Sequence, residues 1–166
     1  SQAVDLPTAW SLEKNIVWSK KLPSWSGGTP VIWGNRIFLT SPDSGEETQG
    51  GEKLLLGCLS TVDGSVLWQR TLDEGNAYWR KHNNTSPSPV TNGEQVIAVA
   101  GTGMIRAYDM QGEELWHYSL QKEHGAFGLM WGYASSPLLY DGALFVEVLH
   151  GMNTDEPSYL IAFDAA

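Results

Sequence analysis

Three segments of the sequence repeat the same order of strand and turn signals. In each, a proline opens a short apolar strand, a glycine-containing turn follows, and a second apolar strand comes after the turn. Two of these turns, Asn92-Gly93 and Asp141-Gly142, are strong hairpin signals because a type I′ turn requires positive φ at both central residues. The opening prolines Pro30, Pro89 and Pro137 lie about 59 and 48 residues apart. This spacing is typical of four-stranded propeller blades separated by loops.

Each of the first two repeats continues into a second pair of strands, and the last strand of the four carries a tryptophan, Trp68 or Trp116. The third repeat reaches Phe163-Asp164, where its third strand would end. The sequence therefore predicts an all-β fold, a single partial β-propeller domain over 1–166 with about three blades of four-stranded antiparallel sheet. Its predicted parts are an orphan outer strand at 16–21, blades at 28–72 and 85–120, and an incomplete blade at 134–166.

An ordinary β-sandwich is the alternative fold, but it does not explain why the turn, tryptophan and proline positions recur together. In the propeller, Trp18, Trp68 and Trp116 are structural residues that we expect to be largely buried between blades. Cys58 lies within an apolar strand pattern and is expected to be an inert core residue.

The net charge of −9 and the pI of about 4.7 limit the partners. Lysine and arginine are scattered without a basic stripe, so nucleic acid and anionic membranes are excluded as expected partners. No apolar run approaches the length of a transmembrane helix. With Cys58 as the single cysteine, a disulfide within the chain is impossible.

Several motifs carry a family resemblance. Ala107-Tyr108-Asp109 followed by Leu115-Trp116 resembles the tryptophan-docking repeat of the PQQ-like propellers. This superfamily includes quinoprotein alcohol dehydrogenases and the outer-membrane assembly lipoprotein of the β-barrel machinery. Asn84–Val90 and Trp131–Pro137 resemble segments of bacterial PQQ-binding-like β-propeller repeat proteins. Ser60 departs from the pattern, since the repeat usually has aspartate there, and we expect this change to be local.

The resemblance implies a periplasmic or otherwise exported protein. It implies no cofactor if the chain is a binding propeller, and PQQ with calcium if it is a quinoprotein dehydrogenase. The latter enzymes typically have a vicinal cysteine pair over the quinone, which a chain with only Cys58 cannot form. The fold alone does not decide between these functions.

Strand parity places the long connections on one face of the propeller. The minimal glycine turns fall on one rim, whereas the segments 22–29, 73–86, 121–135, 41–53 and 150–158 all fall on the other. Long loops gathered on a rigid scaffold are where binding chemistry usually lies. The candidate ligand-binding residues on this long-loop face are Trp79, His82, Asn83, Asn84, His124, Trp131, Tyr133, His150 and Asp155.

Three of these residues, His82, His124 and His150, could bind a metal together with Asp155. They come from different loops and show no HxH or HExxH spacing, so we predict no metal site and structural roles for the histidines. Asn84 is expected to cap the end of its loop through side-chain to backbone hydrogen bonds.

No catalytic residue can be assigned, because no GxSxG or comparable nucleophile motif occurs. The sequence therefore favours a non-catalytic binding or scaffolding propeller that takes a protein or small ligand at the long-loop face. The alternative is a PQQ-dependent dehydrogenase whose catalytic residues lie partly outside this chain, and a sensor propeller is a third. Three blades cannot close a ring, so we expect the rest of a propeller or a second copy to complete it.

Overall fold

The computed structural model describes residues 7–11, 13–43, 53–79, 82–152 and 154–165. Its first sheet has the order β1-β2-β3-β4, with every neighbouring pair antiparallel. The four strands are β1 (Val31–Trp33), β2 (Arg36–Pro42), β3 (Lys53–Ser60) and β4 (Val66–Glu74).

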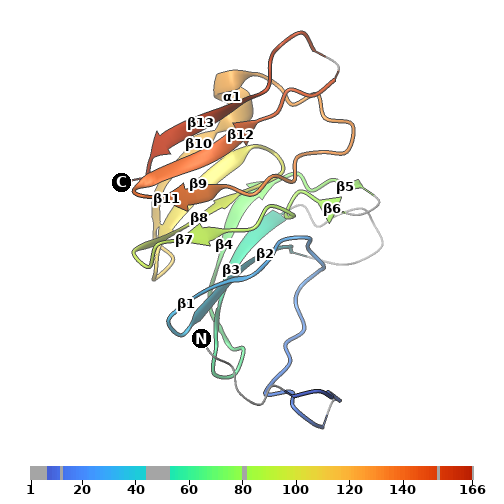
Figure 1. The fold of residues 1–166 in the computed structure, drawn as a ribbon, viewed down its shortest axis with the longest axis vertical. Coiled ribbons are helices and arrows are strands. Elements are labelled where there is room, and N and C mark those ends of the chain that lie inside the picture. The colour runs from blue at the N-terminus through green and yellow to red at the C-terminus, as the bar shows by residue number, and fades with distance from the viewer. Residues whose placement is uncertain (1–6, 12, 44–52, 80–81, 153, 166) are drawn as a thin grey trace.

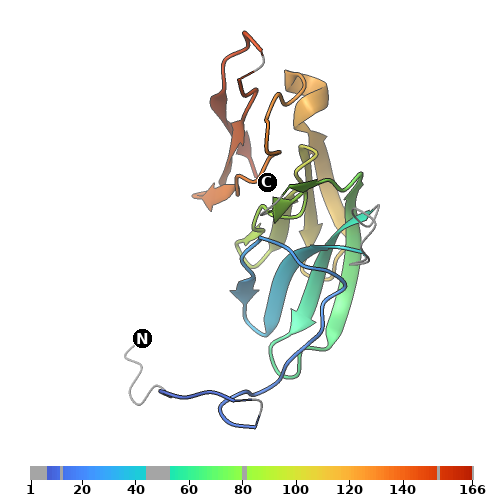
Figure 2. The same ribbon diagram turned by 90° about the vertical axis from the view of Figure 1, so that its right-hand side faces the viewer.

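Two more sheets repeat this up-and-down order. The second has the order β7-β8-β9-β10 and the third β11-β12-β13, again antiparallel throughout. Their strands are β7 (Val90–Thr91), β8 (Gln95–Val99), β9 (Met104–Asp109), β10 (Glu114–Ser119), β11 (Leu138–Tyr140), β12 (Ala143–Val148) and β13 (Tyr159–Asp164). Figures 1 and 2 show the three sheets stacked along the long axis of the molecule. The prediction of an all-β, partial propeller of about three blades is confirmed.

The core consists of two apolar layers, one between each pair of neighbouring sheets. Side chains alternate between the faces of a strand, so a strand in the middle of a stack can serve both layers. In β8, Val96 and Ala98 pack toward the first sheet, whereas Ile97 and Val99 pack toward the third. All four are fully buried. The middle blade is therefore sealed on both faces, as a propeller blade requires.

Cys58 lies in the first of these layers and is fully buried. Burial raises the pKa of its thiol to about 11, although the charge of Arg36 opposes the shift. The thiolate is the reactive form of cysteine, so this side chain is an inert core residue, as the sequence predicted.

The predicted orphan strand at 16–21 is not a strand. Residues 16–21 have no ladder pairing in the structure. An outer strand pairs with the third strand of its own blade, and β13, which has a free edge, lies at the opposite end of the stack (Figure 1). The segment runs beside the first sheet without ladder hydrogen bonds.

Trp18 and Trp68 nevertheless dock in the same way, each on the blade that follows it. Nε1 of Trp18 donates to the carbonyl of Thr61 at 2.9 Å, and Nε1 of Trp68 donates to the carbonyl of Met110 at 3.0 Å. Both acceptors lie directly after the third strand of the following blade. Each ring thus hydrogen-bonds the turn between the third and fourth strands of the next sheet.

Both rings cover a glycine of that turn. A Cβ at Gly64 would come within 2.7 Å of the Trp18 ring, and a Cβ at Gly112 within 2.8 Å of the Trp68 ring. Contacts this short require a residue without a side chain. Trp116 has a buried Nε1 with no hydrogen-bond partner among the described residues.

The three tryptophans are partly buried, with most of each residue shielded from solvent. Trp68 also contacts Phe38 and Tyr108, with ring centroids 5.8 and 6.2 Å apart.

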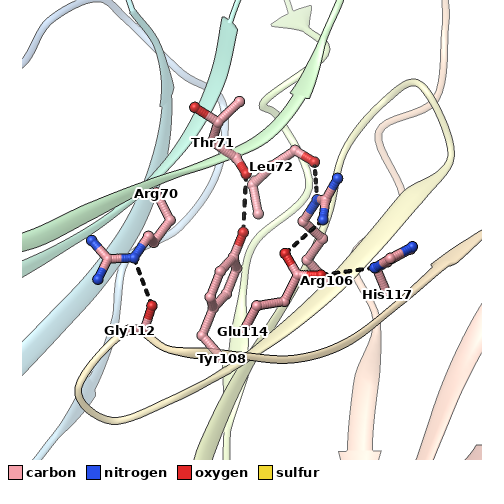
Figure 3. Close-up of polar contacts among 8 residues, drawn as sticks. All are labelled: Arg70, Thr71, Leu72, Arg106, Tyr108, Gly112, Glu114 and His117. Atoms are coloured by element: carbon pink, nitrogen blue, oxygen red, sulfur yellow. Dashed lines mark hydrogen bonds and ion pairs between the residues drawn. The ribbon is translucent and has the colours of Figure 1, made fainter.

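Polar contacts join the first blade to the second beside Trp68 (Figure 3). Nε of Arg70 on β4 donates to the carbonyl of Gly112 at 2.6 Å. The hydroxyl of Tyr108 on β9 donates to the carbonyl of Thr71 at 3.0 Å. Because both acceptors are backbone carbonyls, these bonds fix the position of one blade against the next.

Arg106 is the third member of this set (Figure 3). Its Nε donates to the carbonyl of Leu72 at 2.6 Å, and its Nη1 forms a 2.6 Å ion pair with Glu114. Partial burial of Glu114 opposes ionisation, but hydrogen bonds from His117 and Arg106 outweigh it and hold the pKa of this carboxyl below its usual range. Arg106 therefore stays paired while it bridges the blades.

Candidate binding rim

The long connections gather on one rim of the stack, toward the right and top of Figure 1, together with the tight turn from β8 to β9. The other rim has the turns from β1 to β2, β3 to β4, β7 to β8, β9 to β10 and β11 to β12. The connection from β4 to β7 contains the short hairpin β5 (Tyr78–Trp79) and β6 (His82–Asn83). The connection from β10 to β11 contains α1 (Leu120–His124). The long connection from β12 to β13 spans residues 149–158. The predicted loop 41–53 lies mostly outside the described residues.

Hydrogen bonds hold the loop that starts with α1. The Ser119 side chain caps the helix by accepting from the backbone N–H of Lys122 at 3.4 Å. Gln121 then bridges two segments, since its Nε2 donates to the carbonyl of Thr102 at 2.6 Å and its Oε1 accepts from the N–H of Phe127 at 2.9 Å. The loop is thus fixed to the tight turn between β8 and β9.

Asn83 and Asn84, two of the candidate ligand-binding residues, are buried. Nδ2 of Asn83 donates to the carbonyl of Trp25, and its Oδ1 accepts from both the N–H and the hydroxyl of Thr85. Nδ2 of Asn84 donates to the carbonyl of Gly75 at 2.8 Å, the capping role that the sequence suggested. Both side chains brace the loop from inside, where they are shielded from a ligand in solution.

Tyr133, another of the candidate ligand-binding residues, has a structural role. It is 1% exposed, its ring stacks on Phe127 with centroids 5.0 Å apart, and its hydroxyl donates to the carbonyl of Glu147 at 2.9 Å. Burial raises the pKa of this phenol far above its ordinary value, with a contribution from Glu147. The Tyr133 side chain therefore packs beneath the loop.

The structure brings His124 and His150 together. Nε2 of His150 lies 2.7 Å from the carbonyl oxygen of His124, and Nδ1 lies 2.9 Å from that of Pro157. The His124 ring lies between two tyrosines, with Nε2 2.9 Å from the hydroxyl of Tyr118 and Nδ1 2.7 Å from that of Tyr159. These nitrogens are used in hydrogen bonds that hold the loops together.

The remaining candidates lie apart from this pair. His82 contacts the carbonyl of Trp131 through its ring, which joins the β5–β6 hairpin to the neighbouring loop. Asp155 is exposed. Trp79 lies in β5, and its side chain falls outside what the structure describes. Within the described residues, no group of three or more His, Cys, Asp or Glu side chains is placed to hold a metal ion.

An apolar hollow opens on this rim where two loops meet. The N–H of Gly128 donates to the carbonyl of His150 at 2.7 Å, and Gly128 and Gly151 form a parallel bridge. The hollow beside this bridge measures about 290 Å³. Its lining residues, which we call the rim hollow, are Leu129, Met130, Trp131, Gly132, Gly151 and Met152.

Three side chains of the rim hollow are strongly exposed, namely Met130 at 64%, Trp131 at 60% and Met152 at 86%. A cluster of large apolar side chains in water, on loops that hydrogen bonds hold in place, is typical of an interaction site. The sequence pointed to Trp131 but not to the two methionines. The signal for Met130 was the apolar run Leu129-Met130-Trp131, in a loop that needs no such residues for strand pairing, whereas no comparable run marks Met152.

Two other hollows lie on the flanks of the outer sheets. One, of about 390 Å³, lies between residues 20–23 and the first sheet. The other, of about 450 Å³, lies on the free face of the third sheet and includes Leu138, Tyr140 and Leu160. In a closed propeller, faces of this kind pack against neighbouring blades, so the rim hollow is the better candidate for a separate ligand.

Comparison with known proteins identifies the family. The profile described as outer membrane protein assembly factor BamB matches residues 5–165. The chain belongs to this family of PQQ-like β-propeller repeat proteins. No curated protein matches the sequence at a significant level.

Solved structures of this and related families share the fold. BamB from Moraxella catarrhalis superposes with a TM-score of 0.58 at 18% identity, over 90% of this chain and 40% of that protein. The quinohemoprotein alcohol dehydrogenase ADHIIG from Pseudomonas putida HK5 has a TM-score of 0.56 at 16% identity, over 91% of this chain and 21% of the enzyme. A europium-containing methanol dehydrogenase has a TM-score of 0.52 at 18% identity, over 86% and 24%.

These likenesses establish the propeller fold, and the chain spans two fifths or less of each of these three structures. BamB-like and dehydrogenase propellers therefore share the blade architecture seen here. No helix in the described part of the chain is long and apolar enough to cross a membrane.

Proposed function

We propose that this chain is part of a non-catalytic propeller that binds a partner protein through the rim hollow. The observation that carries the proposal is the exposure of Met130, Trp131 and Met152 around a cavity of about 290 Å³. Methionine is flexible and polarizable, and exposed tryptophan is a frequent anchor of protein interfaces. The family description, an outer membrane protein assembly factor, supports a protein partner.

The chemistry of the rim defines the partner segment. The hollow is lined by apolar side chains and glycines, so an apolar side chain of the partner fits it. Asp155 and Glu156 are exposed on the loop that carries Met152, and the chain has a net charge of −9. The partner segment is therefore an apolar anchor flanked by basic residues.

The family also supports a location and an assembly. By analogy with an outer membrane assembly factor, the protein acts after export, in the periplasm of a bacterium. The apolar flanks of the first and third sheets pack against further blades of the same propeller, or against a second copy that closes the ring.

The alternative, a dehydrogenase with PQQ and calcium, has no observation in its favour beyond the shared fold. Calcium is bound by oxygen ligands, chiefly carboxylates and carbonyls. Among the described residues no group of three or more acidic side chains converges in this way, so the described residues do not fit PQQ with calcium.

Site-specific photo-cross-linking in cells of the native host tests the proposal. A photoreactive residue replaces Met152 on the rim or, as the control, Val62, which is 74% exposed on the opposite rim. We expect one discrete protein adduct from position 152 and none from position 62. The additional change Trp131→Asp should remove the adduct. Failure to form a discrete adduct at 152, or the same adduct from 62, would contradict the proposal.

A further inference from the structure

His150 is a buried histidine whose two ring nitrogens both face backbone carbonyl oxygens. The residue is 2% exposed. Nε2 lies 2.7 Å from the carbonyl of His124 at the end of α1, and Nδ1 lies 2.9 Å from the carbonyl of Pro157 in the loop between β12 and β13. The ring therefore links two loops that are distant in sequence.

Only one protonation state satisfies this arrangement. A carbonyl oxygen can only accept, and neutral imidazole has a single N–H to donate. Imidazolium carries an N–H on both nitrogens, so it can bond to His124 and Pro157 at the same time. After loss of one proton, a nitrogen lone pair would face a carbonyl oxygen at hydrogen-bonding distance, and that bond would be lost.

The surrounding groups are compatible with a positive charge. The negative charge of Glu156, in the same loop as His150, favours the protonated ring. The Tyr159 ring packs against His150, with ring centroids 6.0 Å apart, and both ring nitrogens of His124 are hydrogen-bonded, one to the hydroxyl of Tyr118 and one to that of Tyr159. On α1, Lys122 and Glu123 pair with each other at 3.8 Å. Asp155, also in the loop, adds negative charge.

The hydrogen bonds to the carbonyls of Pro157 and His124 raise the pKa of His150 above its ordinary value, and the Glu156 charge adds to this, while burial opposes it. A group whose pKa is higher in the folded than in the unfolded state contributes its full stabilisation when the pH is below the unfolded-state pKa, which is about 6.5 for histidine. This stabilisation is then lost as the pH rises through the folded-state pKa.

We propose that protonated His150 is a pH-dependent clasp that holds the α1 loop against the β12–β13 loop and opens when the ring loses its proton. The clasp adjoins the rim hollow in sequence. Gly128 donates to the backbone carbonyl of His150, and Gly151 and Met152 follow directly. Opening the clasp separates the two loops that together line the hollow.

The effect on partner binding rests on the proposed function, whereas the clasp itself does not. If the rim binds a partner, affinity falls as the pH rises through the titration of His150. The free protein can be examined without any partner, so the clasp and the proposed function can fail independently.

NMR of the free protein tests the clasp. Side-chain titration should give His150 a pKa above the ordinary value of about 6.5. Hydrogen exchange at the Gly128 amide, corrected for its intrinsic pH dependence, should show protection that falls several-fold as His150 titrates. His150→Phe keeps a ring but has no donor, so Gly128 protection should be low and independent of pH. His117→Gln, an exposed change on β10, should behave as the wild type.

A His150 pKa at or below the ordinary value in the wild-type protein would overturn the proposal, even if the His150→Phe variant failed to fold. So would Gly128 protection that stayed constant while His150 lost its proton.

Discussion

Gly112 is a residue at which backbone conformation and side-chain packing both demand glycine. Its φ is +86°, and a Cβ there would come within 2.8 Å of the Trp68 ring. Gly142 occupies a turn with a φ of +76°, but a Cβ there would meet nothing within 4 Å. The two positions therefore separate the cost of the left-handed backbone from the cost of displacing the tryptophan.

We expect Gly142→Ala to lower the free energy of unfolding by about 1–2 kcal/mol, the cost of a left-handed conformation for a residue with a Cβ. Gly112→Ala should cost about 2–4 kcal/mol, because overpacking adds to the same backbone cost. Urea denaturation of the two variants measures the difference. Equal losses would mean that contact between Trp68 and the turn contributes nothing to stability.

Single residues also show how far the sequence could predict the site. The long-loop face was correctly located by strand parity, because loop length and strand order are visible in the sequence. The sequence suggested that Asn84 caps the end of its loop, but it did not settle whether Asn83 and Tyr133 are buried. Each is a polar residue in a surface loop, yet each is buried by hydrogen bonds to segments up to dozens of residues away. Such partners are set by tertiary contacts that no local pattern encodes.

At the scale of elements, the interface between β4 and β9 combines aromatic packing with buried hydrogen bonds. Tyr108 is 2% exposed and donates to the carbonyl of Thr71 (Figure 3). Burial raises the pKa of its phenol, so the group remains a donor across the neutral range. The corresponding position of the third blade is Phe163, which packs on Tyr118 with centroids 5.0 Å apart. The position thus tolerates a ring without a hydroxyl.

Tyr108→Phe should therefore fold normally and lose about 1 kcal/mol, the net value of a typical buried hydrogen bond. Tyr140→Phe is the matched control, since Tyr140 is 70% exposed on the free face of β11. Its effect should be close to zero. Chemical denaturation monitored by tryptophan fluorescence compares them, and equal stability of all three proteins would contradict the role of the Thr71 bond.

The repeat predicted every complete blade but misassigned the segment 16–21. Trp18 makes the contacts that the repeat predicts for this tryptophan. Its ring hydrogen-bonds Thr61 and packs on Gly64, as the Trp68 ring does with the equivalent residues of the next blade. A tryptophan at this place in the repeat indicates that its ring docks on the next blade. A β-strand requires, in addition, a neighbouring strand with which to form backbone hydrogen bonds. The sequence of one segment contains no information on whether that partner is beside it.

At the scale of the whole molecule, the outer faces of the stack are apolar. Leu138, Tyr140 and Leu160 on the third sheet are between 62% and 70% exposed, and they line a hollow of about 450 Å³. Exposed apolar patches of this kind mark surfaces that become covered in an assembly. We propose that blades or a second copy cover this face.

Thiol labelling tests that coverage with little background, because Cys58 is the single native cysteine, is buried and has a pKa raised to about 11. In the native protein, Leu160→Cys should react with a maleimide much more slowly than Val62→Cys, which lies on an exposed turn. Equal labelling rates would show that the third sheet stays open to solvent.

Binding of a partner protein at the rim hollow is tested most directly by calorimetry, with the purified partner that cross-linking identifies. Trp131→Ala should weaken binding at least about 30-fold, the effect of losing a tryptophan anchor worth about 2 kcal/mol. Val62→Ala, on the opposite rim, should leave the affinity unchanged, and both variants should melt as the wild type. Unchanged affinity in Trp131→Ala, with the fold intact, would contradict the claim.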